Sequence, residues 1–196
     1  LGERKIGHSG TLDPDATGVL LLGVGDATRL LRFLDNVTID GRATTSKSYT
    51  GTVVLGTETT TLDASGEVTA TYDMSAIIDG LTIDKVQAIV DGDIGRQLLG
   101  DVMQVPPMVS ALKVDGKRLH ELAREGIEIE REARPVTVHS FTVVAVRGNE
   151  VDIDVTCSSG TYIRTLAADL GTIMGGGAHL TNLRRTSIGR FTVAET

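Results

Sequence analysis

The stretch GHSGTLDPDATGVLLLGVGDATR, residues 7–29, places an acidic residue inside a tight turn and follows it with a short apolar run. Gly10 gives the backbone freedom before Asp13, and Pro14 biases Asp13 toward an extended conformation. We expect Leu12 to anchor this turn to a core. The turn chemistry is compatible with a carboxylate held at the tip of a rigid loop, and also with an ordinary Asp-Pro turn that satisfies nearby backbone amides.

The composition is that of a soluble globular protein. The chain has 196 residues, of which 40% are hydrophobic, so a single domain is expected. Its one cysteine, Cys157, excludes an intramolecular disulfide and favours a reducing, cytoplasmic setting. Because Cys157 ends an apolar stretch, we expect it to lie in the core rather than act as a nucleophile. No apolar run approaches the roughly 20 residues that span a bilayer.

The net charge of −7 argues against a polyanionic partner only superficially. Residues 35–102 contain four basic and eleven acidic side chains, so this one stretch accounts for the whole net charge. The remaining parts of the chain are balanced and could face a phosphate backbone. Gly23-Val24-Gly25 lacks the third glycine of a dinucleotide-binding loop and indicates a turn rather than a cofactor site.

Hydrophobic periodicity predicts a mixture of strands and helices. Strands are expected at 19–22 (buried), 48–55, 136–146, 151–156 and 187–193, helices at 26–34, 83–90 and 161–174, and a loop at 57–71. Asp26 is a candidate helix cap, and Thr82 or Asp84 stands near the start of the helix at 83–90. Hairpin-connected strands with interspersed helices predict an α+β fold, with a mixed, mainly antiparallel sheet flanked by helices.

Arg164 stands at the start of the helix predicted over 161–174. The helix dipole favours anions at that end, so an arginine there does not complement it. We expect an anionic partner for Arg164, either a phosphate or a carboxylate such as Asp13. The alternative is a solvated surface arginine.

Several long motifs occur in the order in which they occur in the TruB family of RNA pseudouridine synthases. Residues 7–29 resemble the catalytic-loop motif of that family, and KSYTGTVVLG resembles its second motif. SSGTYIRTLAADLG and GGGAHLTNLRRTSIGRF resemble the third and fourth motifs, and QVPPMVSALKVDGKRLHELAREG resembles the RNA-gripping insertion of the bacterial branch. The resemblance covers nearly the whole chain.

The resemblance implies one pseudouridine synthase catalytic domain over residues 1–196, with an RNA-gripping insertion at about 100–135. It implies isomerisation of uridine 55 in the tRNA T loop by base flipping, with an aspartate-dependent break of the N-glycosidic bond and its re-formation as a C-glycosidic bond. Neither a metal nor an organic cofactor is implied. The expected partner is the T arm of tRNA, with no membrane, no obligate protein partner and a monomeric state.

The resemblance also implies the roles of individual residues. Asp13 matches the catalytic aspartate, which attacks either ribose C1′ or the pyrimidine ring, and Arg164 matches its arginine partner. Tyr49 matches the tyrosine that stacks on the target base and assists proton transfer, while Tyr162 and Leu183 match further base contacts. His8 matches a histidine that fills space in the RNA loop after flipping. The expected contacts to the RNA backbone are Lys113, Lys117, Arg118, Arg184 and Arg185, although interleaved acidic residues in the insertion also fit a salt-bridged, solvated surface.

Two features set the chain apart from the family pattern. It begins after the strand and helix that normally precede the catalytic loop, and we expect this N-terminal segment and a C-terminal RNA-binding extension to be absent. The alternatives to an active enzyme are therefore an RNA-binding or tRNA-folding module that is inactive in this form, and a guide-RNA-dependent relative.

Overall fold

A computed structural model of the chain describes residues 2–34, 38–39, 42–43, 46–114 and 116–193. One seven-stranded sheet organises these residues, with the strand order β15-β14-β6-β13-β12-β9 and β2 beside β14. All neighbours are antiparallel except β2 and β14, which confirms the predicted mixed, mainly antiparallel sheet. The strands are β2 Thr17–Gly18, β6 Lys47–Leu55, β9 Gly100–Gln104, β12 Arg134–Arg147, β13 Glu150–Cys157, β14 Ala178–Ile188 and β15 Phe191–Thr192.

Strands β6 and β13 form the centre of the sheet. In β13 every second side chain, from Val151 to Cys157, is buried, as expected when one face of a strand packs on a core. Cys157 is fully buried, and burial raises the pKa of its thiol to about 11. The predicted strands at 48–55, 136–146 and 151–156 are confirmed, and so is the core position of Cys157.

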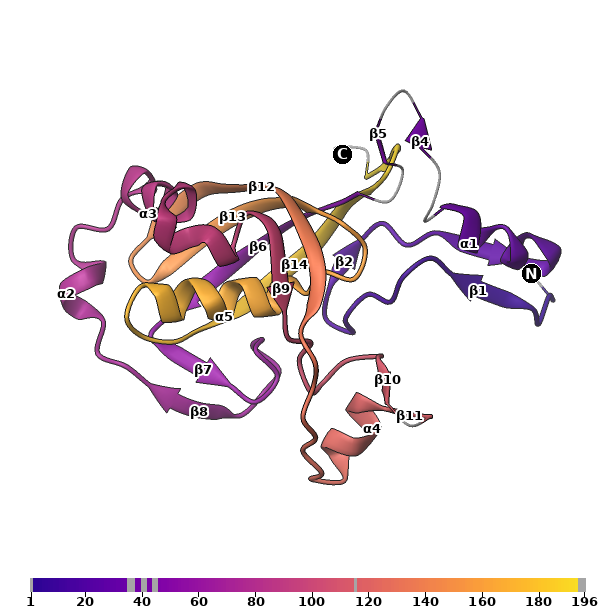
Figure 1. The fold of residues 1–196 in the computed structure, drawn as a ribbon, viewed down its shortest axis with the longest axis horizontal. Helices are drawn as coiled ribbons and strands as arrows, with labels where there is room; N and C mark the ends of the chain where they lie inside the picture. The colour runs from indigo at the N-terminus through magenta and orange to yellow at the C-terminus, as the bar shows by residue number, and fades with distance from the viewer. Residues whose placement is uncertain (1, 35–37, 40–41, 44–45, 115, 194–196) are drawn as a thin grey trace.

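Two longer helices pack against this sheet (Figure 1). Helix α5, Ile163–Ile173, buries Leu166, Ala167 and Leu170 with no exposure. Helix α3, Ile83–Asp91, begins after Thr82, whose hydroxyl accepts a hydrogen bond from the Lys85 backbone amide, so Thr82 rather than Asp84 caps it. Short α2, Ser75–Ile78, and the 3-10 turn η2, Asp93–Gln97, flank α3. None of the described helices has the length and apolar character needed to cross a membrane.

The N-terminal residues form a ribbon that extends away from the sheet (Figure 1). Its strands β1, Ile6–His8, and β3, Leu22–Val24, pair only with each other. The prediction of a buried strand at 19–22 is therefore wrong, because Leu20 and Leu22 are exposed and none of the described residues forms a layer that covers them. The predicted helix at 26–34 is divided into a 3-10 turn, η1 Gly25–Arg29, and a short α1, Leu31–Leu34, and Asp26 does not cap it.

Two other predictions missed short strands. The expected loop at 57–71 contains a hairpin of β7, Thr57–Thr59, and β8, Val68–Thr71. The expected strand at 187–193 covers the end of β14, a turn at Gly189 and β15. Two-residue strands β4, Thr38–Ile39, and β5, Arg42–Ala43, pair with each other.

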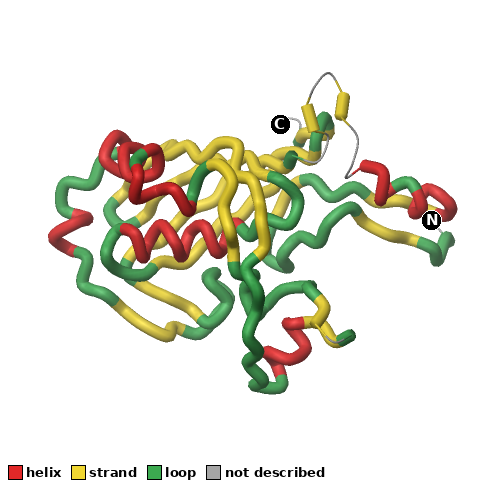
Figure 2. The backbone as a smooth tube through the Cα atoms, viewed as in Figure 1, coloured by secondary structure: helices red, strands yellow, loops and turns green. Residues whose placement is uncertain are grey.

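Residues 105–133 protrude from the sheet between β9 and β12 (Figure 2). This segment contains β10 Lys113–Val114, β11 Lys117–Arg118 and the short helix α4 Leu119–Arg124. Strand β9 belongs to the main sheet, where it pairs with β12. The protruding part is therefore shorter at its start than the insertion expected at about 100–135.

Asp169 on α5 generates a prediction about stability. Burial raises the pKa of this carboxyl from its usual 3.8 to about 6. The folded state therefore holds the proton more tightly, so this group favours folding below about pH 4 and the contribution is lost as the pH rises through about 6. We expect Asp169→Asn to raise the free energy of unfolding by about 1 kcal/mol at pH 8, a value reduced for partial solvation, and to have little effect at pH 4.

Urea unfolding of both proteins at pH 4, 6 and 8 measures this effect. Asp79→Asn, at an exposed position after α2, serves as the control and should leave the pH dependence unchanged. Parallel pH profiles for wild type and Asp169→Asn would contradict the expectation.

Candidate active site

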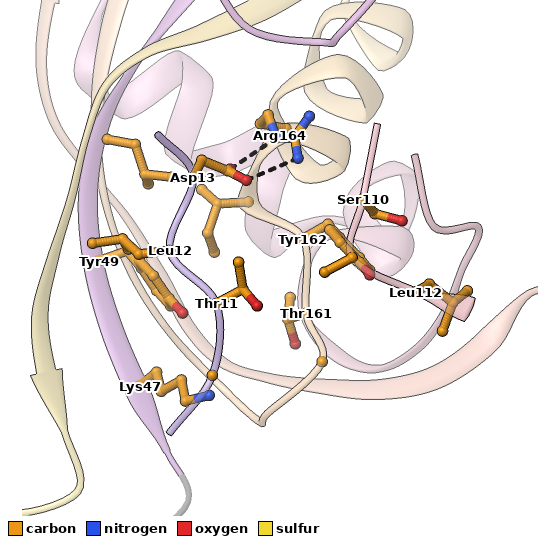
Figure 3. A pocket seen from close by; sticks show the side chains of 15 residues that line it. Thr11, Leu12, Asp13, Lys47, Tyr49, Ser110, Leu112, Thr161, Tyr162 and Arg164 are labelled. Atoms are coloured by element: carbon orange, nitrogen blue, oxygen red, sulfur yellow. Dashed lines mark hydrogen bonds and ion pairs between the residues drawn. The ribbon is translucent and has the colours of Figure 1, made fainter. Parts of the chain in front are cut away.

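A cavity of about 280 Å³ opens where the catalytic-loop motif meets β6 and the start of α5 (Figure 3). Asp13 and Arg164 lie at one end of it, Tyr49 and Lys47 along one wall, and Tyr162 along the opposite wall. Its lining residues are Gly10, Thr11, Leu12, Asp13, Lys47, Tyr49, Ser110, Ala111, Leu112, Gly160, Thr161, Tyr162, Ile163, Arg164 and Leu183. Five candidate residues from the sequence are therefore brought together here, from parts of the chain far apart in sequence.

The loop that presents Asp13 depends on two glycines. Gly10 has φ +79°, and Gly18 has φ +105°, a region in which residues with a side chain are strained. A Cβ atom at Gly18 would also lie 2.0 Å from the backbone oxygen of Arg185 in β14. Between these glycines, the Ala16 amide donates to the Asp13 carbonyl at 3.0 Å and closes a turn. Leu12 lines the cavity instead of anchoring the turn in a core, so that prediction is wrong.

Asp13 forms a two-point ion pair with Arg164. Nε of Arg164 donates to Oδ2 of Asp13 at 3.0 Å, and an Nη2 hydrogen donates to Oδ1 at 3.0 Å. This arrangement fixes the plane of the carboxylate, because the guanidinium matches its two oxygens. Arg164 is 4% exposed whereas Asp13 is 35% exposed, so the carboxylate faces the cavity from a buried support. The predicted partnership of Arg164 and Asp13 is confirmed.

The remaining donors of Arg164 also have partners. Nη1 donates to the Thr61 carbonyl at 2.7 Å and Nη2 to the Val109 carbonyl at 2.8 Å. A second carboxylate, Asp63, lies 3.5 Å from Nε. Two anionic groups and two carbonyls thus compensate a buried cation that sits at the unfavourable end of the α5 dipole.

Asp63 was missed in the sequence, where it lies in a Thr-rich stretch that was interpreted as a loop. Its Oδ1 accepts hydrogen bonds from the Thr61 hydroxyl and the Ser65 amide. Backbone bonds of Leu62 and Ala64 to Leu180 fasten this loop to β14. Leu62 has φ +61°, which a leucine adopts only under strain, and such strain is concentrated at functional sites. An acidic residue flanked by Thr and Ser was the available signal.

The ionisation of Asp63 reflects these contacts. Burial raises the pKa of Asp63, but the hydrogen bonds from Ser65 and Thr61 and the charge of Arg164 outweigh burial. The net result is a pKa below the usual value. Asp63 therefore supplies a second negative charge beside Arg164 at neutral pH.

Tyr49 in β6 contributes an aromatic ring and a hydroxyl group to one wall of the cavity. It is 9% exposed, and burial raises the pKa of its hydroxyl to about 12. The side chain is therefore a neutral phenol at physiological pH. Its ring can pack against a flat apolar group while the hydroxyl donates or accepts a hydrogen bond.

Tyr162 and Leu183 complete the walls that the sequence predicted. The peptide of Tyr162 is held by Gln104, whose Oε1 accepts from the Tyr162 amide at 2.8 Å and whose Nε2 donates to its carbonyl at 3.1 Å. Leu183 lies at a bulge, where β14 has one residue more than β6 between the pairs Thr181–Thr52 and Arg184–Thr50. Bulges beside a site redirect side chains, and here Leu183 lines the cavity. Gln104 was not anticipated from the sequence.

Lys47 is a further residue that the sequence analysis missed. Its side chain is 7% exposed and lines the cavity. Its Nζ lies close to Gly10, because a Cβ atom added to Gly10 would be 2.6 Å from Nζ of Lys47. Lys47 lies two residues before Tyr49 in β6, so both side chains point to the same face of the strand. That spacing was visible in the sequence.

The other predicted contacts lie outside the cavity. His8 is exposed on β1, and Arg184 is exposed on β14, where its Nη1 contacts the Thr17 hydroxyl at 3.3 Å. Lys117 is exposed, with Nζ 3.8 Å from Glu125. The side chains of Lys113 and Arg118 lie outside the described part of the chain. Arg185 is fully buried, which contradicts the predicted contact with an RNA phosphate.

A second cavity, of about 260 Å³, shares Asp13, Arg164 and Leu183 with the first and also touches Asp63. The ion pair therefore borders both cavities. Across the described residues, no three His, Cys, Asp or Glu side chains are grouped in a way that could hold a metal ion.

Comparison with known proteins gives two family matches that together cover the chain. Residues 1–163 match the model described as TruB family pseudouridylate synthase (N terminal domain), and residues 164–196 match the tRNA pseudouridylate synthase B C-terminal domain. The chain is 52% identical to tRNA pseudouridine synthase B of Rhodococcus jostii (strain RHA1), over 98% of this chain and 59% of that protein. It is 49% identical to tRNA pseudouridine synthase B of Aromatoleum aromaticum, over 100% of this chain and 58% of that protein. The chain thus spans about three-fifths of these relatives.

Solved structures with a similar fold include a Cbf5-Nop10-Gar1 complex. The chain is similar to that structure with a TM-score of 0.63 and 28% identity, over 97% of this chain and 42% of the other. An archaeal box H/ACA sRNP Nop10-Cbf5 complex gives a TM-score of 0.59 at 25% identity, over 99% of this chain and 42% of the other.

Asp63 provides a test of the charge balance around Arg164. Because the pKa of Asp63 is lowered, its contribution to stability is present above the usual pKa and is lost as the pH falls through the folded value. In Asp63→Asn the amide has no charge to offer Arg164, so we expect a loss of about 1 kcal/mol at pH 7 that shrinks toward pH 3.

Urea unfolding at pH 7 and pH 3 measures this difference. Asp73→Asn is the matched control, since hydrogen bonds from Ser75 lower the pKa of Asp73 in a similar way but, among the described residues, no arginine pairs with it. The control should lose less stability at pH 7. Equal stability of wild type and Asp63→Asn at pH 7 would show that Asp63 does not support Arg164.

Proposed function

The chain belongs to the TruB family of pseudouridylate synthases, and on that basis we propose that it isomerises uridine 55 in the T loop of tRNA to pseudouridine. The relatives that it resembles over nearly its whole length carry the name tRNA pseudouridine synthase B, which supports tRNA as the substrate. The single observation that carries the proposal is the Asp13 carboxylate, aimed into a cavity by a buried arginine and flanked by two tyrosines.

The cavity suits a base that has left its stack. Extrusion of a nucleotide costs a few kcal/mol, which contacts in the pocket must offset. Tyr49, Tyr162 and Leu183 offer aromatic and apolar faces to a pyrimidine ring, and the Tyr49 hydroxyl can hydrogen-bond its edge. A cavity of about 280 Å³ leaves room for the base together with part of its ribose.

The reaction exchanges one glycosidic bond for another. The bond between N1 and C1′ breaks, a bond between C5 and C1′ forms, the proton on C5 leaves, and N1 gains a proton, so no atom is lost or added. In this proposal Asp13 is the nucleophile, and attack at C1′ and attack at the pyrimidine ring are both compatible with its position at the end of the cavity. Arg164 orients the carboxylate, while Asp63, 3.5 Å from Nε of Arg164, supplies a second negative charge that balances the buried guanidinium.

Tyr49 would act as a neutral phenol. Because burial raises the pKa of its hydroxyl to about 12, it keeps its proton near neutral pH. We therefore assign it stacking on the base and a relay of the C5 proton through its hydroxyl, rather than removal of that proton by a resident phenolate.

Outside the cavity, exposed side chains are the candidates for contacts with the RNA. Arg184 and Lys117 present their charges to solvent, from β14 and from the protruding segment 105–133. His8 lies exposed on β1, in the same loop motif as Asp13. We propose that the two cations contact RNA phosphates and that His8 fills the space that the flipped nucleotide leaves.

The proposal includes no protein partner and a monomeric enzyme. A guide-RNA-dependent relative is the rival, since the similar solved structures are complexes that contain Nop10. An RNA-binding or tRNA-folding module without activity is a second rival. The assay below separates the three.

The test is release of tritium from an unmodified T-arm hairpin labelled at C5 of uridine, using purified full-length protein alone. Wild type should release tritium at position 55, and Asp13→Asn should lower the rate by at least about 10³-fold while RNA affinity is retained. Asp15→Asn, an exposed carboxylate on the same loop, is the matched control and should behave as wild type.

The rivals give other results. Binding without tritium release by wild type would support the inactive module, and release that needs an added guide RNA and protein partner would support the guide-dependent rival. Conversion by Asp13→Asn at the wild-type rate would remove Asp13 from the catalytic role.

A further inference from the structure

Arg185 is a cation buried in the interior beside the cavity. Its side chain has no solvent exposure, and among the described residues no carboxylate lies within ion-pair distance of it. A charge buried without an opposite charge is unfavourable for folding unless it is fully hydrogen-bonded, and an apolar side chain of similar size is often as stable or more so. The presence of arginine at this position therefore calls for an explanation other than stability.

The contacts of Arg185 are with the loop that presents Asp13. Its Nε donates to the Val19 carbonyl at 2.7 Å, while the Val19 amide donates back to the Arg185 carbonyl at 2.8 Å. At the other end of the loop, Nη1 and Nη2 lie 3.5 Å from the carbonyls of Thr11 and Gly10. One side chain thus contacts the loop both before and after Asp13.

Arg185 is also a neighbour of Tyr49 in the sheet. Arg185 and Tyr49 are directly paired across β14 and β6. The positive charge of Arg185 lowers the pKa of the Tyr49 hydroxyl against the larger rise that burial causes. A guanidinium has only donors, so it can offer hydrogens to the phenol oxygen but cannot take the phenol proton.

A direct role in binding RNA does not fit this position. Arg184, the neighbouring residue in β14, is exposed, whereas Arg185 points into the protein. Gly10 lies between Arg185 and the buried Lys47, with both cations near the place a Cβ atom would occupy. The start of the loop thus lies close to two buried cations, of which Lys47 also lines the cavity.

We propose that Arg185 is a positioning residue for the reaction: by contacting both ends of the Asp13 loop from the residue paired with Tyr49 across β14 and β6, it sets the spacing between the carboxylate and the phenol across the cavity. This inference rests on the proposed function. It assigns Arg185 an effect on the chemical step rather than on RNA affinity, because the group touches neither solvent nor the cavity surface.

The experiment compares Arg185→Met and Arg185→Lys in the full-length protein. For each variant the single-turnover rate of tritium release is measured at saturating T-arm hairpin, together with the Kd for that hairpin and the folded fraction. Arg96→Gln, an exposed arginine paired with Asp93, is the control for loss of one positive charge.

We expect Arg185→Met to lower the saturated rate per folded molecule by roughly 100-fold, since a displacement of about 1 Å in a site has an effect of that size. Its Kd should remain within about three-fold of wild type. Arg185→Lys should recover part of the rate, because an ammonium can bond one of the carbonyls but cannot span them. Arg96→Gln should match wild type in both measurements.

Other outcomes overturn the inference. A wild-type rate per folded molecule in Arg185→Met would reduce Arg185 to a structural role, and a raised Kd with an unchanged saturated rate would make it a binding residue. If neither variant folds, Arg185 is a determinant of the fold and the inference is wrong. Absence of tritium release by wild type is a different result, since it contradicts the proposed function itself.

Discussion

The pair between Asp13 and Arg164 is the interaction on which the rest of the site depends. Arg164, in α5, is 4% exposed and contacts three other parts of the chain: Asp13, the Thr61–Asp63 loop and Val109. A buried guanidinium needs all of its donors satisfied, so each of these segments is constrained by the same group. The position of the carboxylate is therefore a consequence of the packing of α5 on the sheet.

The surrounding backbone accommodates this arrangement at a few strained or crowded positions. Gly10 and Gly18 take positive φ on either side of Asp13, and Leu62 does so beside Asp63. Arg185 and Lys47 flank the start of the loop from inside the protein. Rigid support of this kind allows a carboxylate and an aromatic wall to hold their geometry before a substrate arrives, which reduces the cost of orientation during the reaction.

Sequence reasoning succeeded where local pattern and burial agree. The alternation in 151–156 and the helical spacing in 161–174 gave β13 and α5, since each presents one apolar face to a single core. The apolar run 19–22 gave a wrong strand, because hydrophobicity alone does not say whether another layer covers a segment, and Leu22 is exposed.

The site residues divide in the same way: some could be predicted from the sequence around them, and others only from contacts between distant segments. The anionic partner of Arg164 could be expected from the helix dipole, but the roles of Gln104 and Asp63 could not, since they arise from contacts between distant segments. Arg185 shows most clearly what could not be predicted from the sequence. Two adjacent arginines look equivalent in the sequence, but strand alternation turns Arg184 to solvent and Arg185 into the protein, and the sequence does not say which of the two is buried.

The most direct test of the central claim is the saturated rate of pseudouridine formation by Arg164→Lys. Lysine keeps the positive charge but lacks the planar fork that bonds both oxygens of Asp13. If the orientation of the Asp13 carboxylate governs the reaction, the rate per folded molecule should fall by roughly 100-fold. The Kd for the T-arm hairpin should stay within about three-fold of wild type. A wild-type rate in this variant would contradict the claim that the Asp13–Arg164 geometry carries the chemistry.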